Sequence, residues 1–314
     1  MRILVVGAGA LGGYFGGRLL EVGRDVTFLV RERRKAQLRQ GGLVIRSSDG
    51  ETVLHAPPTV LSSELVTPFD VIVVACKAYD LQASMETFAC AVGSSTMVVP
   101  LLNGMRHLEL LASRFGSEKV LGGYCAISAS VSLNGEVLHH SPGMHALTFG
   151  ELDGRLSLRV LALQSPCQNA NMQAGATETV LQEMWEKWIF LAALAGLTCL
   201  MRASIGDIVA IGRADLAMSI FDECNALATR QGFGARPASI DRSLKLLTTE
   251  GSDLTASMLK DIEGGHAVEA DHILGDFLAR DEGLKRADAP LLTVAYAHLQ
   301  AYEIRRTRNL ARSI

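Results

Sequence analysis

The sequence predicts an α/β domain over residues 1–175, followed by an all-helical domain over residues 176–314. In the first half, short β-branched apolar runs alternate with amphipathic stretches of helical spacing, which is typical of βαβ units. After about residue 175 the strand pattern disappears and only helical spacing remains. A chain of 314 residues is also longer than one hydrophobic core usually supports. We therefore expect two domains.

The first half alternates strands and helices. The apolar runs are Ile3–Val6, Val26–Val30, Val71–Ala75 and Met97–Leu101. The helical segments between them are Leu11–Val22, Arg33–Arg39, Leu81–Ala91 and His107–Phe115. This order predicts a parallel sheet with helices on both faces. Three more strand-like runs follow in close succession, and we expect them to extend the sheet: Val120–Ser128, Glu136–His140 and Ala146–Phe149.

The second half reads as helices separated by short breaks. A long helical pattern begins at Thr177, and the later segments are Arg213–Gln231, Ser239–Thr248, Ser257–Gly264, Glu269–Glu282 and Ala289–Arg308. Within the first of these helices, Trp188–Met201 is the most hydrophobic stretch of the chain. As a helix it would span about 21 Å, short of a bilayer core of about 30 Å. We therefore predict a buried core helix, no contact with a membrane and a cytoplasmic location.

The composition is that of a globular protein, with 48% hydrophobic and 20% charged residues. A formal net charge of only −3 gives no general attraction to nucleic acid. The 6 cysteines are scattered and form no CxxC pair, so we expect reduced thiols and no metal site. The apolar helical half can also support a homodimer.

A glycine-rich turn follows the first predicted strand directly. It has the pattern G-x-G-x-x-G and consists of Gly7, Ala8, Gly9, Ala10, Leu11 and Gly12. Such a loop between a strand and a helix lets the backbone approach a pyrophosphate, and the helix N-terminus adds N–H donors. The alternative is an ordinary glycine-rich turn. We predict a Rossmann-type dinucleotide-binding domain.

The residue at the end of the second strand indicates which dinucleotide binds. Enzymes that use NAD usually carry an acidic residue there, for the ribose hydroxyls. Here the strand ends at Arg31, and more basic residues follow. A planar guanidinium is suited to the 2′-phosphate of NADP, so the expected cofactor is NADP (NADPH). Glu32 leaves an NAD-type contact open, and a solvated helix start is the third reading.

Polar residues also follow two later strands, at the edge of the sheet where ligands collect. Lys77 comes after the third strand, and Asn103 after the fourth. Lys77 can hold a phosphate or carboxylate, while Asn103 can hydrogen-bond a nicotinamide ribose or a substrate. Ordinary turn polarity explains either residue equally well on its own.

Three residues of the helical half can take part in chemistry. Lys187 precedes the most apolar stretch, where it can lose hydration and donate a proton more easily, or extend to solvent. Ser257 and Glu269 lie on either side of a double-glycine break. A helix cap and a surface acid are the alternatives for these two.

Taken together, these motifs resemble the ketopantoate reductases (2-dehydropantoate 2-reductases) along essentially the whole chain. The matching segments are G-A-G-A-L-G, C-K-A-Y-D, L-N-G-M, E-x-x-x-K at 183–187 and S-M-L-x-D-I…E-x-D at 257–271. The resemblance implies reduction of 2-dehydropantoate to (R)-pantoate with NADPH, on the route to pantothenate. It also implies an active site between the two domains.

The resemblance assigns a role to each matching residue. Lys187 corresponds to the general acid that protonates the carbonyl oxygen, and Glu269 to the acid that positions this lysine and contacts substrate and cofactor. Ser257 corresponds to the residue that binds the substrate carboxylate. Asn103 corresponds to the asparagine beside nicotinamide and substrate, and Lys77 to the lysine on the cofactor side.

One departure concerns the substrate. Members of the family usually carry asparagines one and two turns after the lysine, where this chain has Leu191 and Ala195. A different branched 2-oxo acid is therefore an open alternative, as is a non-catalytic NADP-binding sensor. The 3-hydroxyacyl and 6-phosphogluconate-type dehydrogenases share the two-domain plan, but the spacing of Lys187 and Glu269 fits them less well.

Overall fold

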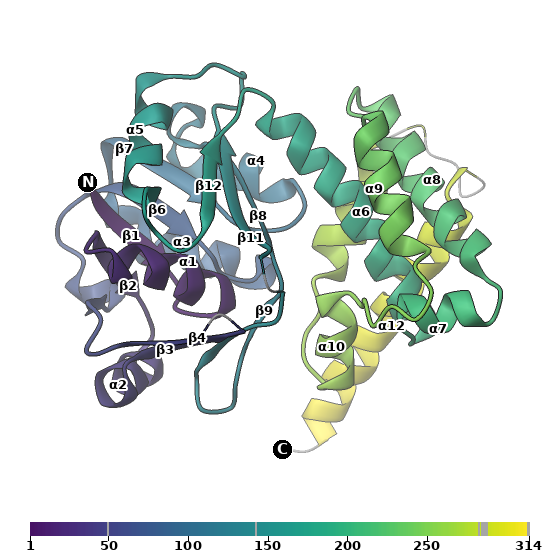
Figure 1. Ribbon diagram of the computed structural model, residues 1–314, viewed down its shortest axis with the longest axis horizontal. Coiled ribbons are helices and arrows are strands. Elements are labelled where there is room, and N and C mark those ends of the chain that lie inside the picture. Colours follow the sequence, from purple (N-terminus) through teal and green to yellow (C-terminus); the bar gives the residue numbers. More distant parts are fainter. Residues whose placement is uncertain (49, 142, 282, 284–287, 313–314) are drawn as a thin grey trace. The chain divides into compact units, whose positions relative to one another are not determined.

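The computed structural model describes residues 1–48, 50–141, 143–281, 283 and 288–312. It divides the chain into two compact units (Figure 1). The first comprises Met1–Leu102 and His107–Leu181, and the second comprises Asn103–Arg106 and Gln182–Ile314. The short segment Asn103–Arg106 therefore groups with the helical unit, although it directly follows a strand of the first.

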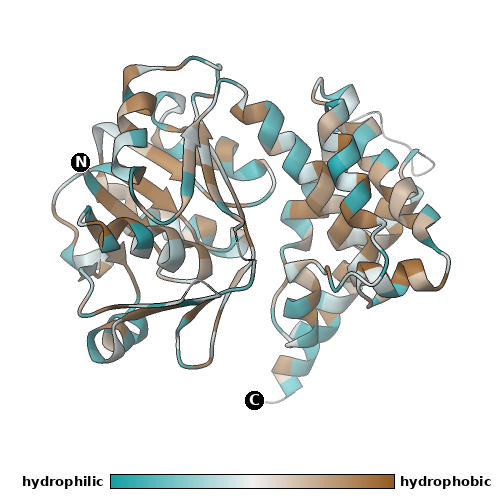
Figure 2. Ribbon diagram, in the orientation of Figure 1, coloured by the Kyte–Doolittle hydropathy of each residue, from teal (hydrophilic) through white to brown (hydrophobic). Residues whose placement is uncertain are grey.

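A five-stranded parallel sheet forms the centre of the first unit. Its strands, in spatial order, are β5 (Thr59–Val60), β2 (Asp25–Leu29), β1 (Arg2–Val6), β6 (Phe69–Val74) and β7 (Val92–Pro100). The central strands are buried because Val, Ile and Leu side chains alternate to both faces, as a sheet covered on both sides requires. Figure 2 shows this hydrophobic interior. The predicted parallel sheet is confirmed.

The predicted helices of the first half are also present. They are α1 (Ala10–Glu21), α2 (Glu32–Gly41), α3 (Leu81–Phe88) and α4 (Arg106–Phe115), and α5 (Leu158–Cys167) is an addition that the sequence did not predict. A short 3-10 turn, Ala78–Asp80, follows β6. The helices α1 to α4 follow the strands β1, β2, β6 and β7 of the central parallel sheet, so the turns between these strands and helices lie at one edge of that sheet.

The prediction that later strands extend this sheet is wrong. They pair in two further sheets, of order β4-β3-β10-β9 and β12-β11-β8. The strands are β3 (Leu43–Ser47), β4 (Gly50–Leu54), β8 (Gly122–Ile127), β9 (Ala129–Val131), β10 (Val137–His139), β11 (His145–Gly150) and β12 (Gln173–Ala176). Because β3 and β4 form an antiparallel ladder of their own, β10 pairs with β3 instead of the central sheet. An isolated bridge, Val98 to Val120, links the chain before β8 to β7.

The second unit is helical, as predicted. Its elements are α6 (Val180–Met201), α7 (Ile205–Ala210), α8 (Ala214–Arg230), α9 (Pro237–Leu247), α10 (Ser257–Glu263), a π-helical turn (Asp271–Gly275), α11 (Asp276–Ala279) and α12 (Pro290–Arg312). The predicted helix Glu269–Glu282 is present over residues 270–279, as a π-helical turn that continues directly into α11, and it ends earlier than predicted; Glu282 lies outside the described residues.

The long helix α6 provides the core of this unit. It has 22 residues, more than the apolar stretch Trp188–Met201, so by length and composition alone it could cross a membrane. However, 72% of its apolar window is buried inside the fold, as in a core helix of a globular protein. Trp188 packs edge-on against Phe277 with ring centroids 4.4 Å apart, and Trp185 stacks on Phe233.

Candidate active site

The glycine loop of the first unit has the geometry of a phosphate cradle. Gly7 has φ +94°, which favours glycine. A Cβ on Gly12 would lie 2.0 Å from the Gly7 carbonyl oxygen, so a side chain there is incompatible with the turn. At Gly9, by contrast, a Cβ would meet nothing within 4 Å, so the space in front of this backbone is open. The loop therefore fits a pyrophosphate at the N-terminus of α1.

A half-buried arginine hydrogen-bonds to this loop. Arg34 Nε donates a hydrogen bond of 3.0 Å to the carbonyl oxygen of Ala8. Burial lowers the pKa of Arg34, which shows how far the guanidinium has left solvent. Its neighbour Lys35 binds Glu64 at 2.7 Å. Lys35 is therefore already occupied within the fold, whereas the Arg34 guanidinium keeps a buried Nη2 that has no hydrogen-bond partner among the described residues.

Arg31 and Lys77 lie on opposite sides of the glycine loop. Strand order places β2 and β6 on either side of β1, Arg31 follows β2, and Lys77 follows β6. The Arg31 side chain is 83% exposed and its Nη2 lies 3.3 Å from Asp80 Oδ1. Such a surface ion pair is weak and can exchange for a phosphate. The residues present therefore fit NADP.

In the second unit, Asn103 is held by a buried histidine. His272 is 8% exposed, and its ring lies within hydrogen-bonding reach of the backbone carbonyl of Asn103. Gly104 has φ +79°, and a Cβ there would lie 3.0 Å from both the ring and the carbonyl oxygen of His272. The turn at Asn103 is therefore packed directly on this histidine.

The surroundings of His272 favour its neutral form. Burial is the main cause and lowers the pKa of His272, and Arg106 acts in the same direction. Glu269 and Asp276 oppose this effect, as does the hydrogen bond to Asn103. A neutral imidazole that donates to a carbonyl is thus the stable form at neutral pH.

The π-helical turn brings the elements that carry Lys187 and Glu269 together. The carbonyl of Glu269 accepts hydrogen bonds from the backbone N–H groups of His272, at 3.1 Å, and Ile273, at 2.9 Å. The carbonyl of Ile273 in turn accepts a 2.9 Å hydrogen bond from the indole of Trp188, the residue after Lys187. Short π-helical segments are rare and occur frequently at functional sites. Here the segment ties α6 to the turn that follows Glu269.

Lys187 itself is half-buried, and its helix is anchored by the preceding residue. Glu186 is 5% exposed and accepts hydrogen bonds from Arg236 Nε at 2.6 Å and Nη2 at 2.9 Å. Burial alone would raise the pKa of Glu186, but the bonds from Arg236 and Gln182 outweigh it and keep the pKa below its ordinary value. The ion pair fixes the part of α6 from which Lys187 projects.

The two positions that follow Lys187 on its helix face are apolar. Leu191 is half-buried and Ala195 is buried, and both belong to the same continuous helix. Ser257 begins α10, where it is exposed and forms no hydrogen bond with the described residues. The backbone N–H of its neighbour Ala256 lies 3.3 Å from Thr198 Oγ1, which places the start of α10 beside α6.

Sequence reasoning missed Trp188 and His272 in the second unit, and in the first unit it counted Arg34 only among the basic residues near the 2′-phosphate. A signal existed for the first two, since Trp188 adjoins Lys187 and His272 comes one helical turn after Glu269. No sequence pattern indicated that Arg34 would turn inward toward the glycine loop.

Comparison with known proteins identifies the family. Residues 3–154 match the family model described as "Ketopantoate reductase PanE/ApbA", and residues 179–303 match its C-terminal counterpart. The chain belongs to the ketopantoate reductase family. Members of this family depend on NADPH, as the residues around the glycine loop predict.

Several ketopantoate reductase relatives align along almost the full length. "Uncharacterized oxidoreductase YkpB" of Bacillus subtilis is 38% identical over 96% of this chain and 99% of its own. A 2-dehydropantoate 2-reductase of Archaeoglobus fulgidus is 28% identical over 90% of this chain and 91% of its own. The crystal structure of 2-dehydropantoate 2-reductase from Geobacter metallireducens has a TM-score of 0.86, with 28% identity, and covers 96% of this chain and 99% of that one. The protein is thus an oxidoreductase of this fold.

Proposed function

We propose that the protein reduces a 2-oxo acid with NADPH, and that 2-dehydropantoate, which gives (R)-pantoate, is the first substrate to test. The observation that supports this most is the hydrogen bond from Trp188 to Ile273, at 2.9 Å. It holds the helix of Lys187 against the turn of Glu269, and these are the residues that the family resemblance assigns to proton transfer. Asn103 is held beside the same turn by His272.

In this proposal the first unit holds the cofactor. Gly7–Gly12 receive the pyrophosphate, Arg31 the 2′-phosphate, and Lys77 lies on the cofactor side of the site. Bound NADPH supplies the hydride that reduces the 2-oxo carbon. The protein must therefore supply a proton to the carbonyl oxygen and hold the substrate in place.

The second unit supplies the proton and the substrate contacts. Lys187 donates a proton from its ammonium group to the carbonyl oxygen as the C–O double bond is reduced, and regains a proton from solvent afterwards. Glu269 holds Lys187 in position and contacts both ligands. Ser257 binds the substrate carboxylate, and Asn103 hydrogen-bonds the substrate or the nicotinamide ribose. Donors aimed at the carbonyl oxygen stabilise the charge that develops there.

Leu191 and Ala195 favour a second candidate substrate. If the hydroxyl of 2-dehydropantoate faces them, it is buried without a partner, at a cost of about 1–3 kcal/mol. A branched 2-oxo acid without that hydroxyl avoids the cost. The matched pair is 2-dehydropantoate and 3,3-dimethyl-2-oxobutanoate, which has the same carbon skeleton and lacks only the hydroxyl group.

A steady-state assay of NADPH oxidation with these two acids tests the proposal. Turnover of either supports a 2-oxo acid reductase, and the ratio of their kcat/KM values identifies the class. Leu191→Asn should shift that ratio toward 2-dehydropantoate, because it restores a polar partner one turn after Lys187. Tight NADPH binding without turnover of any 2-oxo acid would contradict an enzymatic function and would favour a non-catalytic NADP-binding sensor.

A further inference from the structure

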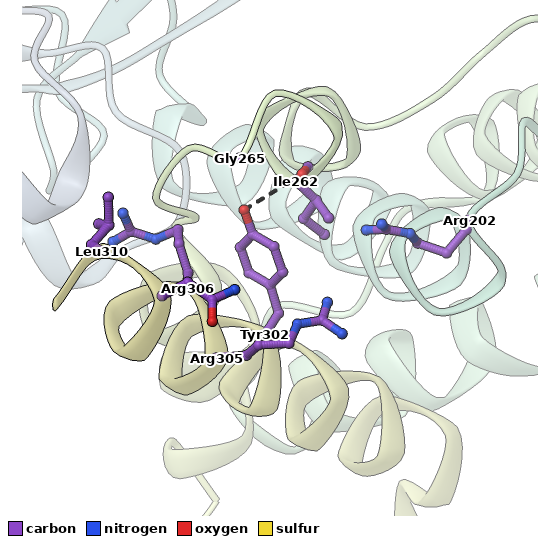
Figure 3. A pocket seen from close by; sticks show the side chains of 8 residues that line it. Arg202, Ile262, Gly265, Tyr302, Arg305, Arg306 and Leu310 are labelled. Carbon is purple, nitrogen blue, oxygen red and sulfur yellow. Dashed lines mark hydrogen bonds between the residues drawn. The ribbon is translucent and has the colours of Figure 1, made fainter. Parts of the chain in front are cut away.

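A hollow lies within the helical unit, beyond the C-terminal end of α6 (Figure 3). Its volume is about 330 Å³. It is lined by residues that follow α6, belong to the end of α10 or lie along α12: Arg202, Ile262, Gly265, Tyr302, Arg305, Arg306, Asn309 and Leu310. None of these residues belongs to the predicted active site. Along α6, Arg202 comes fifteen residues after Lys187, which corresponds to about 22 Å of helix.

Two arginines of this hollow have no acidic partner. Arg202 and Arg305 form no ion pair or hydrogen bond with any described residue. Figure 3 shows their side chains extending toward one another on the same side of the Tyr302 ring. The pKa of His298 is lowered mainly by burial, and the positive charges of both arginines lower it further. Neither guanidinium, both on exposed side chains, is therefore neutralised by an ion pair with a described residue.

The other charges nearby do not remove this excess. Arg306 is paired with Glu303 at 3.0 Å. Asp261 and Glu263 on α10 are close enough to act, together with Arg202, on the pKa of Cys199, but neither is paired with Arg202. Two guanidinium groups that act on the same histidine can both bind an anion with more than one negative charge.

The rest of the lining is mixed, because Arg306 and Asn309 are polar while Tyr302, Ile262 and Leu310 are apolar and the first two are largely buried. The Tyr302 ring lies below the Arg305 guanidinium, whose Cζ is 6.0 Å from the ring centroid. The Tyr302 hydroxyl is already used, because it donates to the carbonyl oxygen of His266 at 2.8 Å. Ile262 and Leu310 add aliphatic surface. An organic group attached to the anion would therefore find a matching surface.

We propose that this hollow is a binding site for a phosphorylated small molecule, separate from the reductase site. A phosphate monoester carries a charge of about −1.5 to −2 at neutral pH and offers three acceptor oxygens, which suits two guanidinium groups. Arg202 and Arg305 hold the phosphate, and the face of Tyr302 with Ile262 receives the organic part. A single carboxylate would neutralise only one of the two arginines.

There is a plain structural explanation for Arg202 alone. A cation just beyond the C-terminus of a helix interacts favourably with the helix dipole, and Arg202 directly follows α6. That explanation predicts a loss of stability on substitution and no effect on any ligand. It does not apply to Arg305, which lies inside α12, before the last turn of that helix.

Calorimetric titration of the full chain with phenyl phosphate, inorganic phosphate and benzoate tests the proposal, without substrate or NADPH. We expect phenyl phosphate to bind more tightly than inorganic phosphate, because only the ester reaches the apolar wall, and benzoate to bind most weakly. Arg202→Gln and Arg305→Gln should each weaken phenyl phosphate binding at least tenfold. Arg202→Lys, which keeps the charge, should lose less.

Two control variants separate this hollow from other sites. Arg308→Gln removes an exposed charge of α12 that does not line the hollow, and it should change the affinity less than twofold. Arg31→Gln should also leave it unchanged; if instead it abolishes binding, phosphate occupies the cofactor loop and the proposal is overturned. The proposal would also be overturned if the Arg202→Gln and Arg305→Gln variants bound phenyl phosphate as tightly as the parent, or if the parent bound benzoate as tightly as phenyl phosphate. Because no turnover is measured, the outcome does not depend on the reductase proposal.

Discussion

The substitution His272→Phe tests how the candidate active site is held together. The variant keeps a planar ring of similar size and removes the N–H that donates to the carbonyl of Asn103. A buried carbonyl that loses its donor costs about 1–3 kcal/mol. Asn103 is half-buried rather than fully buried, so we expect a loss of about 1–2 kcal/mol in the free energy of unfolding at pH 7.5. His272→Gln, which can still donate, is the matched control.

The effect of His272 on stability should depend on pH, because burial lowers the pKa of this residue in the folded protein. Because the pKa of His272 is lowered in the folded state, the folded protein binds fewer protons than the unfolded chain below about pH 6.5. The contribution of His272 to stability is therefore complete above that pH, and it is lost as the pH falls toward the folded-state pKa. The difference between parent and His272→Phe should shrink over the same range, since phenylalanine does not titrate.

Urea denaturation at pH 7.5 and 5.5, combined with steady-state kinetics, measures both effects. A loosened Asn103 should raise KM for the 2-oxo acid several-fold and lower kcat, while the Kd for NADPH changes little. His272→Gln should stay close to the parent in all three quantities. If His272→Phe has the stability and the KM of the parent at pH 7.5, then His272 does not hold Asn103, and the reasoning fails.

Three further substitutions test other parts of the structure. Gly9→Ala should weaken NADPH binding at least tenfold without changing the melting temperature, because the added methyl meets open space in the free protein and the pyrophosphate in the complex; an unchanged Kd in a fluorescence titration would refute this. Arg236→Ala leaves the buried carboxylate of Glu186 without its main partner and should cost about 2 kcal/mol in urea denaturation, a value reduced because Arg236 is 48% exposed. That loss should fade as the pH falls below 4.5, where Glu186 becomes protonated in the unfolded chain and then in the fold. Arg31→Ala should weaken NADPH much more than NADH, and equal effects on both would remove the 2′-phosphate assignment.

The parts of the fold that could be predicted depend on local patterns. The parallel sheet and the helices between its strands follow from apolar runs and helical spacing, and the glycine loop follows from the residues themselves. The sequence also predicted correctly that the face after Lys187 is apolar, since Leu191 and Ala195 share one side of α6.

The parts that could not be predicted depend on contacts between distant segments. Whether β10 joins the central sheet or pairs with β3 is decided by which edge is available, and the spacing of residues in β10 does not encode it. The π-helical turn after Glu269 is an example of the same limit. Its residues have ordinary helical spacing, and the hydrogen bond from Trp188, 85 residues away, accompanies the change. Likewise, the hydrogen bond from Arg34 to the carbonyl of Ala8 joins residues that are 26 positions apart, so no local pattern predicts it.

We propose that this chain reduces a 2-oxo acid with NADPH and that Lys187 supplies the proton. The most direct test compares kcat of the parent and of Lys187→Ala with the better of the two 2-oxo acids, together with the Kd for NADPH measured by fluorescence. We predict that kcat falls by a factor of about 10²–10⁴ while the Kd for NADPH stays within twofold of the parent. A variant that retains the turnover of the parent would contradict the claim.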